Sequence, residues 1–145
     1  MTQAARRPSI HATCLVIDGK GILIRGRSGA GKTSLALALI GAASRKGRHA
    51  RLVADDRVHV EAVDGTLIGR VPATIAGLVE RRGEGVYPID HVGETVIRLV
   101  IDLVETGAPT AEGEVVIDGI PLRRLELPRS PPADPSAILA ILDSL

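Results

Sequence analysis

The sequence of 145 residues has almost no aromatic side chains: Tyr87 is the only one, and there is no Phe or Trp. The core must therefore be built from Val, Ile, Leu and Ala, a composition that favours a sheet rich in β-branched residues with aliphatic helices packed on it. The formal net charge is only +1, and the basic stripe with interleaved aromatics that nucleic-acid binding needs is missing. We expect one compact domain over residues 1–145, with no nucleic-acid partner.

Cysteine and long hydrophobic runs are equally scarce. The single cysteine, Cys14, lies in an apolar run, where a small buried residue is expected rather than a reactive thiol or half of a disulfide. This usage fits a reducing, cytoplasmic compartment. No apolar stretch approaches the roughly 20 residues of a membrane helix, and Arg6 and Arg7 are not followed by the hydrophobic segment of a signal peptide. The sequence therefore predicts a cytoplasmic protein with no membrane partner.

The most informative segment is glycine-rich: Gly26-Arg27-Ser28-Gly29-Ala30-Gly31-Lys32-Thr33. It matches the complete P-loop pattern, between an apolar strand-like run and an apolar helix-like stretch. In such a loop, glycines let backbone N–H groups turn toward phosphate oxygens, the lysine adds positive charge, and the following hydroxyl reaches a Mg²⁺ ion. The residues expected to bind the nucleotide are Gly26, Arg27, Ser28, Gly29, Ala30, Gly31, Lys32, Thr33 and Ser34.

Hydrophobic periodicity predicts a series of short elements without an internal repeat. We expect a loose tail over 1–8, strands over 12–17, 21–25, 51–54, 58–63 and 95–104, and a strand pair within 115–127. Helices are expected over 32–44, 72–82 and 136–145, the last after a Pro-rich linker at 128–135. The Asp-Gly steps at 18–19 and 118–119 predict hairpin turns. The helix over 32–44 is apolar nearly all round, which predicts that it is buried.

Two adjacent acids follow the strand predicted at 51–54. In P-loop enzymes an acid at such a strand end lies near the metal and the γ-phosphate, where it can hold Mg²⁺ or accept a proton. Asp55 and Asp56 could divide these roles; alternatively, one caps a turn and the other is solvated. His11, taken alone, fits a surface or satisfied core histidine. The stretch Glu80 to Gly85, on spacing alone, fits a charged helix end with a glycine cap.

Together these segments resemble the C-terminal catalytic domain of HPr kinase/phosphorylase, a bacterial regulator that phosphorylates a serine of the phosphocarrier protein HPr. The resemblance covers roughly residues 11–91. It rests on four stretches in the family's order: Ile10-His11-Ala12, Gly26 to Ser34, Leu52 to Val58, and Glu80 to Val86. In the last stretch, the residues that match the family's signature are Glu80, Arg82, Gly83 and Gly85.

The resemblance implies an α/β P-loop domain with a mixed, partly antiparallel sheet, similar to phosphoenolpyruvate carboxykinase, and ATP and Mg²⁺ as cofactors. It implies that Lys32 neutralises the phosphates and that Asp56, or failing that Asp55, is the catalytic base, with His11 beside it. The expected metal ligands are Thr33, Asp55 and Glu80. The family's later active-site arginine loop is not recognisable, and Arg123 or Arg124 is its nearest replacement.

The implied activity is that of a Mg-ATP-dependent serine kinase acting on HPr or a related phosphocarrier, with the reverse phosphorylase reaction left open. The separate N-terminal domain of the family is absent from the sequence, which suggests a short form. Family members form hexamers, so a homo-oligomer is expected, and the last helix packs on its own sheet or on a neighbour. Two alternatives stay open: a P-loop enzyme acting on a small molecule or hydrolysing nucleotide, and an ATP-sensing regulatory module.

Overall fold

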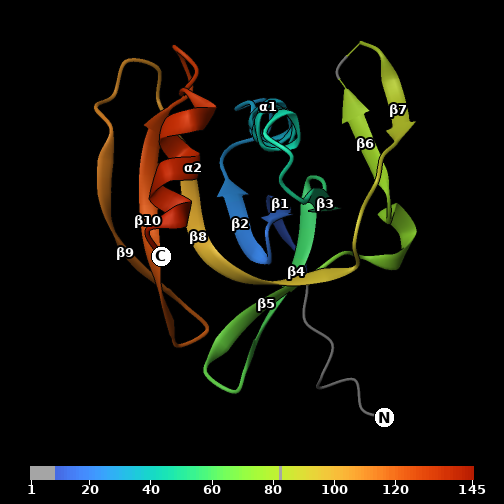
Figure 1. Cartoon of the computed structure of the whole chain (residues 1–145), viewed down its shortest axis with the longest axis horizontal. Coiled ribbons are helices and arrows are strands. Elements are labelled where there is room, and N and C mark those ends of the chain that lie inside the picture. Colours follow the sequence, from blue (N-terminus) through green and yellow to red (C-terminus); the bar gives the residue numbers. More distant parts are fainter. Residues whose placement is uncertain (1–8, 82) are drawn as a thin grey trace.

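The computed structural model describes residues 9–81 and 83–145, so the predicted tail over 1–8 and Arg82 lie outside the described residues. The described chain forms one large mixed sheet, a small hairpin and helices on the sheet (Figure 1). The strands are β1 Ile10–Ile17, β2 Lys20–Arg25, β3 Ala50–Ala54, β4 Arg57–Val63, β5 Thr66–Arg70, β6 Leu78–Arg81, β7 Gly85–Pro88, β8 Glu94–Val104, β9 Ala111–Ile117 and β10 Ile120–Pro128. The helices are α1 Lys32–Arg45 and α2 Pro135–Asp143, with a 3₁₀ turn η2 at Ala73–Ile75.

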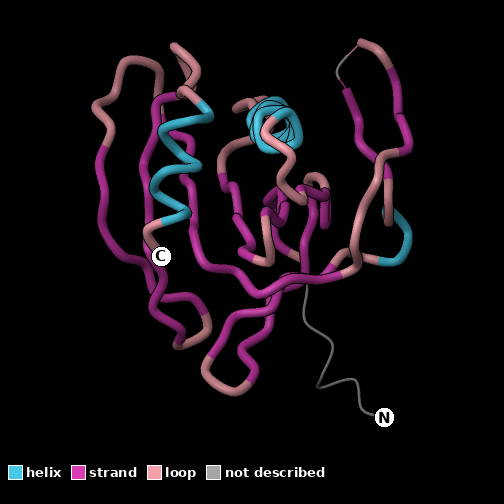
Figure 2. The backbone as a smooth tube through the Cα atoms, in the orientation of Figure 1, coloured by secondary structure: helices cyan, strands magenta, loops and turns pink. Residues whose placement is uncertain are grey.

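The large sheet follows the order β2-β1-β4-β5-β8-β10-β9, with β3 paired to β1. Because β2 also pairs with β8, the strands β1, β2, β8, β5 and β4 close into a ring. Strand β8 is 11 residues long and curves around this ring (Figure 2). It pairs antiparallel with β5 and parallel with β2 and β10. The expected mixed, partly antiparallel sheet is confirmed.

Side chains of β1 alternate between two hydrophobic cores, as the period of a strand requires. Leu15 and Ile17 join the core beneath α1 and α2, whereas Cys14 and Val16 join a second core on the other side. Cys14 is fully buried, and burial raises the pKa of its thiol to about 12. The prediction of a buried, unreactive cysteine is consistent with this environment.

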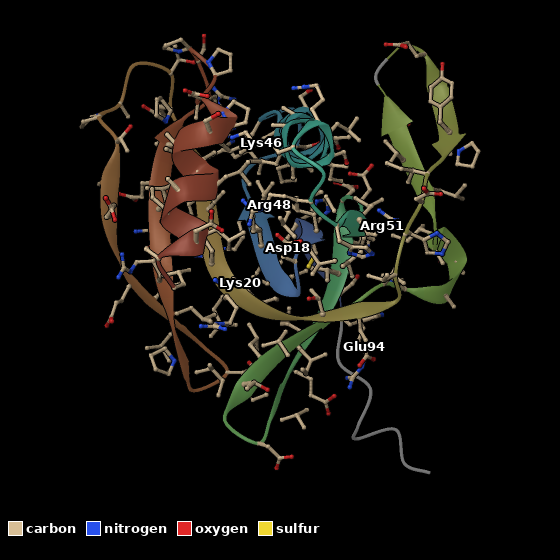
Figure 3. All side chains as sticks on the ribbon, in the orientation of Figure 1. Asp18, Lys20, Lys46, Arg48, Arg51 and Glu94 are labelled. Carbon is tan, nitrogen blue, oxygen red and sulfur yellow. The ribbon has the colours of Figure 1, made fainter. Side chains whose placement is uncertain are left out.

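Helix α2 packs on the chain's own sheet. This is the first of the two arrangements expected for it, packing on its own sheet or on a neighbouring chain. Its buried residues are Ile138, Leu139 and Leu142. Polar contacts hold its end: the Lys20 ammonium donates to the Leu142 and Leu145 carbonyls at 3.2 and 3.1 Å, and Arg48 pairs with both Asp18 and Asp143 (Figure 3). The β1–β2 turn and the segment after α1 therefore both anchor α2.

The predicted Asp-Gly hairpins are confirmed. Asp18-Gly19 and Asp118-Gly119 join β1 to β2 and β9 to β10, and all four residues have positive φ, which matches the twist of a two-residue hairpin. Asp64-Gly65 makes a third such turn between β4 and β5. The sequence reading missed the strand β5.

Two predictions about helices are wrong. The helix expected over 72–82 is the short turn η2 followed by strand β6, because Gly77 takes φ +73 and ends the helical turn. After Gly77, exposed and buried side chains alternate as in a strand: Leu78 is 39% exposed and Val79 is 3% exposed. Helix α1 is not buried all round either: Ser34 and Ala38 are exposed, and only the side facing the sheet is covered.

Within the described residues, no helix is long and apolar enough to span a membrane.

Candidate functional site

The glycine-rich loop joins the end of β2 to the start of α1. Gly31 is the N-cap of α1 with φ +98, and Gly29 has φ +81, conformations that suit glycine. Among the residues that the structure describes, no side chain caps the helix, and the first turn of the helix contains no acidic residue. The first backbone N–H groups and the positive end of the helix dipole are therefore available to an anion.

Lys32 begins α1 and folds back over the loop. It is 5% exposed, and its ammonium donates to the carbonyls of Gly26 and Arg27, both at 3.1 Å. These two bonds use two of the three N–H donors of the ammonium, so one remains for an acceptor in front of the loop. Lys32 thus stabilises the loop conformation and places a positive charge beside the loop.

Asp55 lies directly behind this loop, with 7% of its surface exposed. Its Oδ1 accepts hydrogen bonds from the hydroxyls of Thr33, at 2.7 Å, and Thr13, at 3.3 Å. Its Oδ2 accepts from the backbone N–H of Glu80 at 3.1 Å. One carboxylate therefore joins the first turn of α1, strand β1 and strand β6.

The two aspartates interrupt what would otherwise be one strand. The pairs Cys14↔Ala54 and His11↔Arg57 keep the same register, so β3 and β4 follow one line along β1. Between them Asp56 takes φ +67, and the Arg57 N–H donates to the Asp55 carbonyl at 2.8 Å. This is the bond pattern of a γ-turn with positive φ, a rare and strained geometry. The turn directs the Asp56 side chain toward solvent, and 56% of that side chain is exposed.

A pocket of about 810 Å³ connects these parts, a size in the range of small-ligand sites. Of the predicted site residues, those that line it are Ser28, Gly29, Gly31, Lys32, Thr33, Ser34, Asp55, Asp56 and Glu80; Leu37, Gly83 and Glu84 also contribute. The sequence-based grouping of the loop, the aspartates and Glu80 is thus reproduced in space, although Glu80 comes from a strand and not from a helix end.

Some predicted residues lie beside the pocket rather than in its lining. Gly26 and Arg27 act through their carbonyls on Lys32, and Ala30 is buried under the loop. His11 projects from β1 with Nδ1 3.6 Å from Asp56 Oδ1. It can therefore interact with the exposed Asp56 carboxylate, and it is not among the residues that line the pocket.

Arg123 is not brought to the pocket. The register of β10 places it across from β9, where its guanidinium lies 3.4 Å from the Glu112 carboxylate. Arg124, the alternative, binds Asp102 at 2.5 Å and Glu126 at 2.8 Å. Both arginines are thus engaged with acids of the sheet, because strand pairing and not the sequence distance from the loop decides their neighbours.

Sequence reasoning missed Thr13, which contacts Asp55 and is fully buried. A signal was present: Thr13 is a hydroxyl residue within the apolar run 12–17. The contact itself depends on the pairing of β1 with a strand 42 residues further along the chain.

The chain is similar to a known family and to solved and curated proteins. The model of the HPr Serine kinase C-terminal domain matches residues 2–114. HPr kinase/phosphorylase of Clostridium acetobutylicum is 35% identical over 90% of this chain and 45% of its own length. The protein of the same name from Lactobacillus acidophilus is 39% identical over 69% of this chain and 32% of its own length. The chain therefore spans less than half the length of these relatives.

A solved structure, the Hpr(Ser) kinase/phosphatase from Coxiella burnetii, superposes with a TM-score of 0.78 at 27% identity. The match covers 95% of this chain and 90% of that chain. The fold predicted from the sequence, a mixed α/β domain, is therefore one that a solved member shares.

Proposed function

This chain belongs to the HPr serine kinase C-terminal domain family, and on that premise we propose that it is a Mg-ATP-dependent protein kinase domain that phosphorylates a serine of HPr or a related phosphocarrier. One observation carries the proposal: Asp55 is hydrogen-bonded to Thr33 of the loop, in a pocket that Asp56 and Glu80 also line. A nucleotide-binding loop alone would not require three acids in front of it.

The glycine-rich loop acts in this proposal as a P-loop for ATP. Backbone N–H groups of the loop and of the first turn of α1 bind the phosphate oxygens. Lys32 offers its remaining N–H and its charge to the β- and γ-phosphates. The pocket in front of the loop is large enough for the triphosphate and the attacking side chain.

The oxygen donors near Thr33 fit Mg²⁺. The Thr33 hydroxyl donates a hydrogen bond to Asp55 at 2.7 Å, so the lone pairs of the Thr33 oxygen stay available to a hard cation. Within the described residues no three His, Cys, Asp or Glu side chains form a metal site by themselves. That is compatible with Mg²⁺, which usually takes one or two protein carboxylates together with phosphate oxygens and water. Bound there, the ion would neutralise charge on the phosphates, with Thr33, Asp55 and Glu80 as its protein ligands.

Asp56 is placed to act as the base. It is the exposed member of the pair, so a serine hydroxyl of the target protein can approach it from solvent. Its carboxylate accepts the hydroxyl proton while the serine oxygen bonds to the γ-phosphorus and the bond from that phosphorus to the bridging oxygen of ADP breaks. His11, 3.6 Å away, can steady the carboxylate during this transfer.

The test is transfer of label from γ-labelled ATP with Mg²⁺ to purified HPr-type proteins. We expect label on a serine of the carrier, and losses of at least about a hundredfold for Lys32→Ala and Asp56→Asn. Two matched controls are available. Lys46→Ala removes an exposed lysine at the other end of α1, and Asp64→Asn changes another aspartate with positive φ, in the β4–β5 turn. Both controls should transfer label at the normal rate.

Binding of ATP without transfer to any HPr-type protein would overturn the proposal. Turnover with a metabolite would then indicate a small-molecule kinase. Signalling that survives substitution of Asp55 and Asp56 would indicate a nucleotide sensor.

A further inference from the structure

Thr13 is a fully buried hydroxyl residue in the middle of β1. A buried hydroxyl is costly unless its hydrogen-bonding groups find partners. The neighbours of Thr13 along the strand, Ala12 and Cys14, are apolar and contribute to the second core. The polar requirement of this one position is met by the two aspartates.

The Thr13 hydroxyl makes two bonds of opposite direction. It donates to Asp55 Oδ1 at 3.3 Å and accepts from the backbone N–H of Asp56 at 3.2 Å. A hydroxyl can do both at once, since it carries one proton and two lone pairs. Thr13 therefore links the side chain of the proposed metal ligand to the backbone of the proposed base.

The Asp56 backbone needs such support because φ +67 is unfavourable for a residue with a side chain. Within the described part of the chain, three hydrogen bonds hold the backbone of the turn. Two come from the backbone: the Ala12 N–H donates to the Asp56 carbonyl at 3.2 Å, and the Arg57 N–H donates to the Asp55 carbonyl at 2.8 Å. Any sequence with this strand pairing could make those two. The third depends on the hydroxyl of Thr13.

We propose that Thr13 is a positioning residue for phosphoryl transfer: its hydroxyl holds the Asp55–Asp56 turn so that the Asp56 carboxylate faces the pocket while Asp55 stays bonded to Thr33. The inference rests on the function proposed above. It concerns geometry and not binding, because Thr13 does not line the pocket. Loss of the hydroxyl should therefore lower kcat while leaving ATP affinity unchanged.

The experiment compares Thr13→Val, which keeps the shape and removes the hydroxyl, with Thr13→Ser, which keeps the hydroxyl. Thr95→Val is the matched control, since Thr95 is also a buried strand threonine, and among the described residues its hydroxyl donates to the Val96 carbonyl in β8 and not to an aspartate. We expect Thr13→Val to lower kcat about tenfold or more, with the Kd for Mg-ATP and the melting temperature close to normal. Thr13→Ser should stay within about threefold of the unchanged protein, and Thr95→Val should show no effect on kcat.

Amide hydrogen exchange at Asp56 tests the geometry independently of the substrate. Its N–H should exchange slowly in the unchanged protein and in Thr13→Ser, and at least about tenfold faster in Thr13→Val. Normal kcat in Thr13→Val, or a fall in kcat, ATP binding and melting temperature together, would overturn the inference; so would an inactive Thr13→Ser. Absence of HPr phosphorylation by the unchanged protein, with the exchange pattern as expected, would refute the proposed function and leave the role of Thr13 in holding the turn intact.

Discussion

Asp55 and Asp102 are both nearly inaccessible, at 7% and 8% exposure, yet their partners differ in charge. Within the described parts of the chain, Asp55 accepts hydrogen bonds from neutral groups: two threonine hydroxyls and a backbone N–H. Asp102, in β8, is bound by the guanidinium groups of Arg25 and Arg124. Arg25 donates two bonds to it, at 2.7 and 2.8 Å.

The difference shows how a buried acid can be assigned to function or to stability. Neutral donors fix the direction of a carboxylate without cancelling its charge, so Asp55 can still attract a cation. Two arginines cancel the charge and join β2, β8 and β10. Burial raises the pKa of Asp102, but the hydrogen bonds from Arg25 and Arg124 outweigh it and hold the pKa below its usual value. Asp102 therefore remains a charged part of the framework.

Replacement of aspartate by asparagine should have opposite effects at the two positions: loss of activity at Asp55 and loss of stability at Asp102. If Asp55 holds Mg²⁺ as proposed, Asp55→Asn should lower phosphoryl transfer about a thousandfold, because a neutral amide binds the ion much more weakly than a carboxylate does. Its stability should change by less than about 1 kcal/mol, since hydroxyls can rotate to accept from the amide. Steady-state kinetics and urea unfolding give the two numbers. A loss of activity explained by unfolding would contradict this assignment.

Asp102→Asn should show the reverse. The amide NH₂ would face guanidinium donors, and two arginines would lose their shared counter-charge. We expect a loss of about 2 kcal/mol in the free energy of unfolding, below the value for a completely buried pair because both arginines are partly exposed. Transfer activity of the folded protein should stay within about fivefold. A stable but inactive variant would place Asp102 with the functional acids.

The dependence on pH should sharpen the contrast. Since the pKa of Asp102 is lower in the folded than in the unfolded protein, its contribution to stability is present above its ordinary pKa of about 4 and is lost as the pH falls through the folded value. The difference in unfolding free energy between the unchanged protein and Asp102→Asn should therefore shrink below pH ~4. Urea unfolding at several pH values measures it. A constant difference would show that the ion pairs are not its source.

Cys14 can report the same difference in stability through its rate of labelling. Its thiol is fully buried, and burial raises its pKa to about 12, so labelling at pH 8 must wait for the fold to open. A loss of 2 kcal/mol should speed labelling about thirtyfold in Asp102→Asn, whereas Asp55→Asn should label at nearly the normal rate. Equal rates in the two variants would mean that labelling follows a local opening near β1 that Asp102 does not control.

Local patterns in the sequence predicted most of the residues that line the candidate site. The spacing of glycines in the loop, the apolar run before Asp55 and the Asp-Gly turns each depend on residues close in sequence, and the structure places the loop and both aspartates at one pocket. The misses depend on distant partners. Thr13 contacts Asp55 through strand pairing, and Arg123 contacts Glu112 through the β9–β10 register. Residues 78–81 form a strand and not the predicted helix because they pair with β7.

The closed ring of strands also has a consequence for the order in which the protein assembles. Strand β2 leads into the glycine-rich loop and pairs with β1, which directly precedes it in the sequence. Its second partner, β8, is far along the chain: Arg25 in β2 and Asp102 in β8 are 77 positions apart. Contacts this distant in sequence slow folding, commonly to milliseconds or longer. During synthesis the loop would leave the ribosome long before the strand that supports it. A nascent chain that ends before β8 would contain every residue of the loop. It would still lack one of the two strands that pair with β2, the strand that leads into the loop.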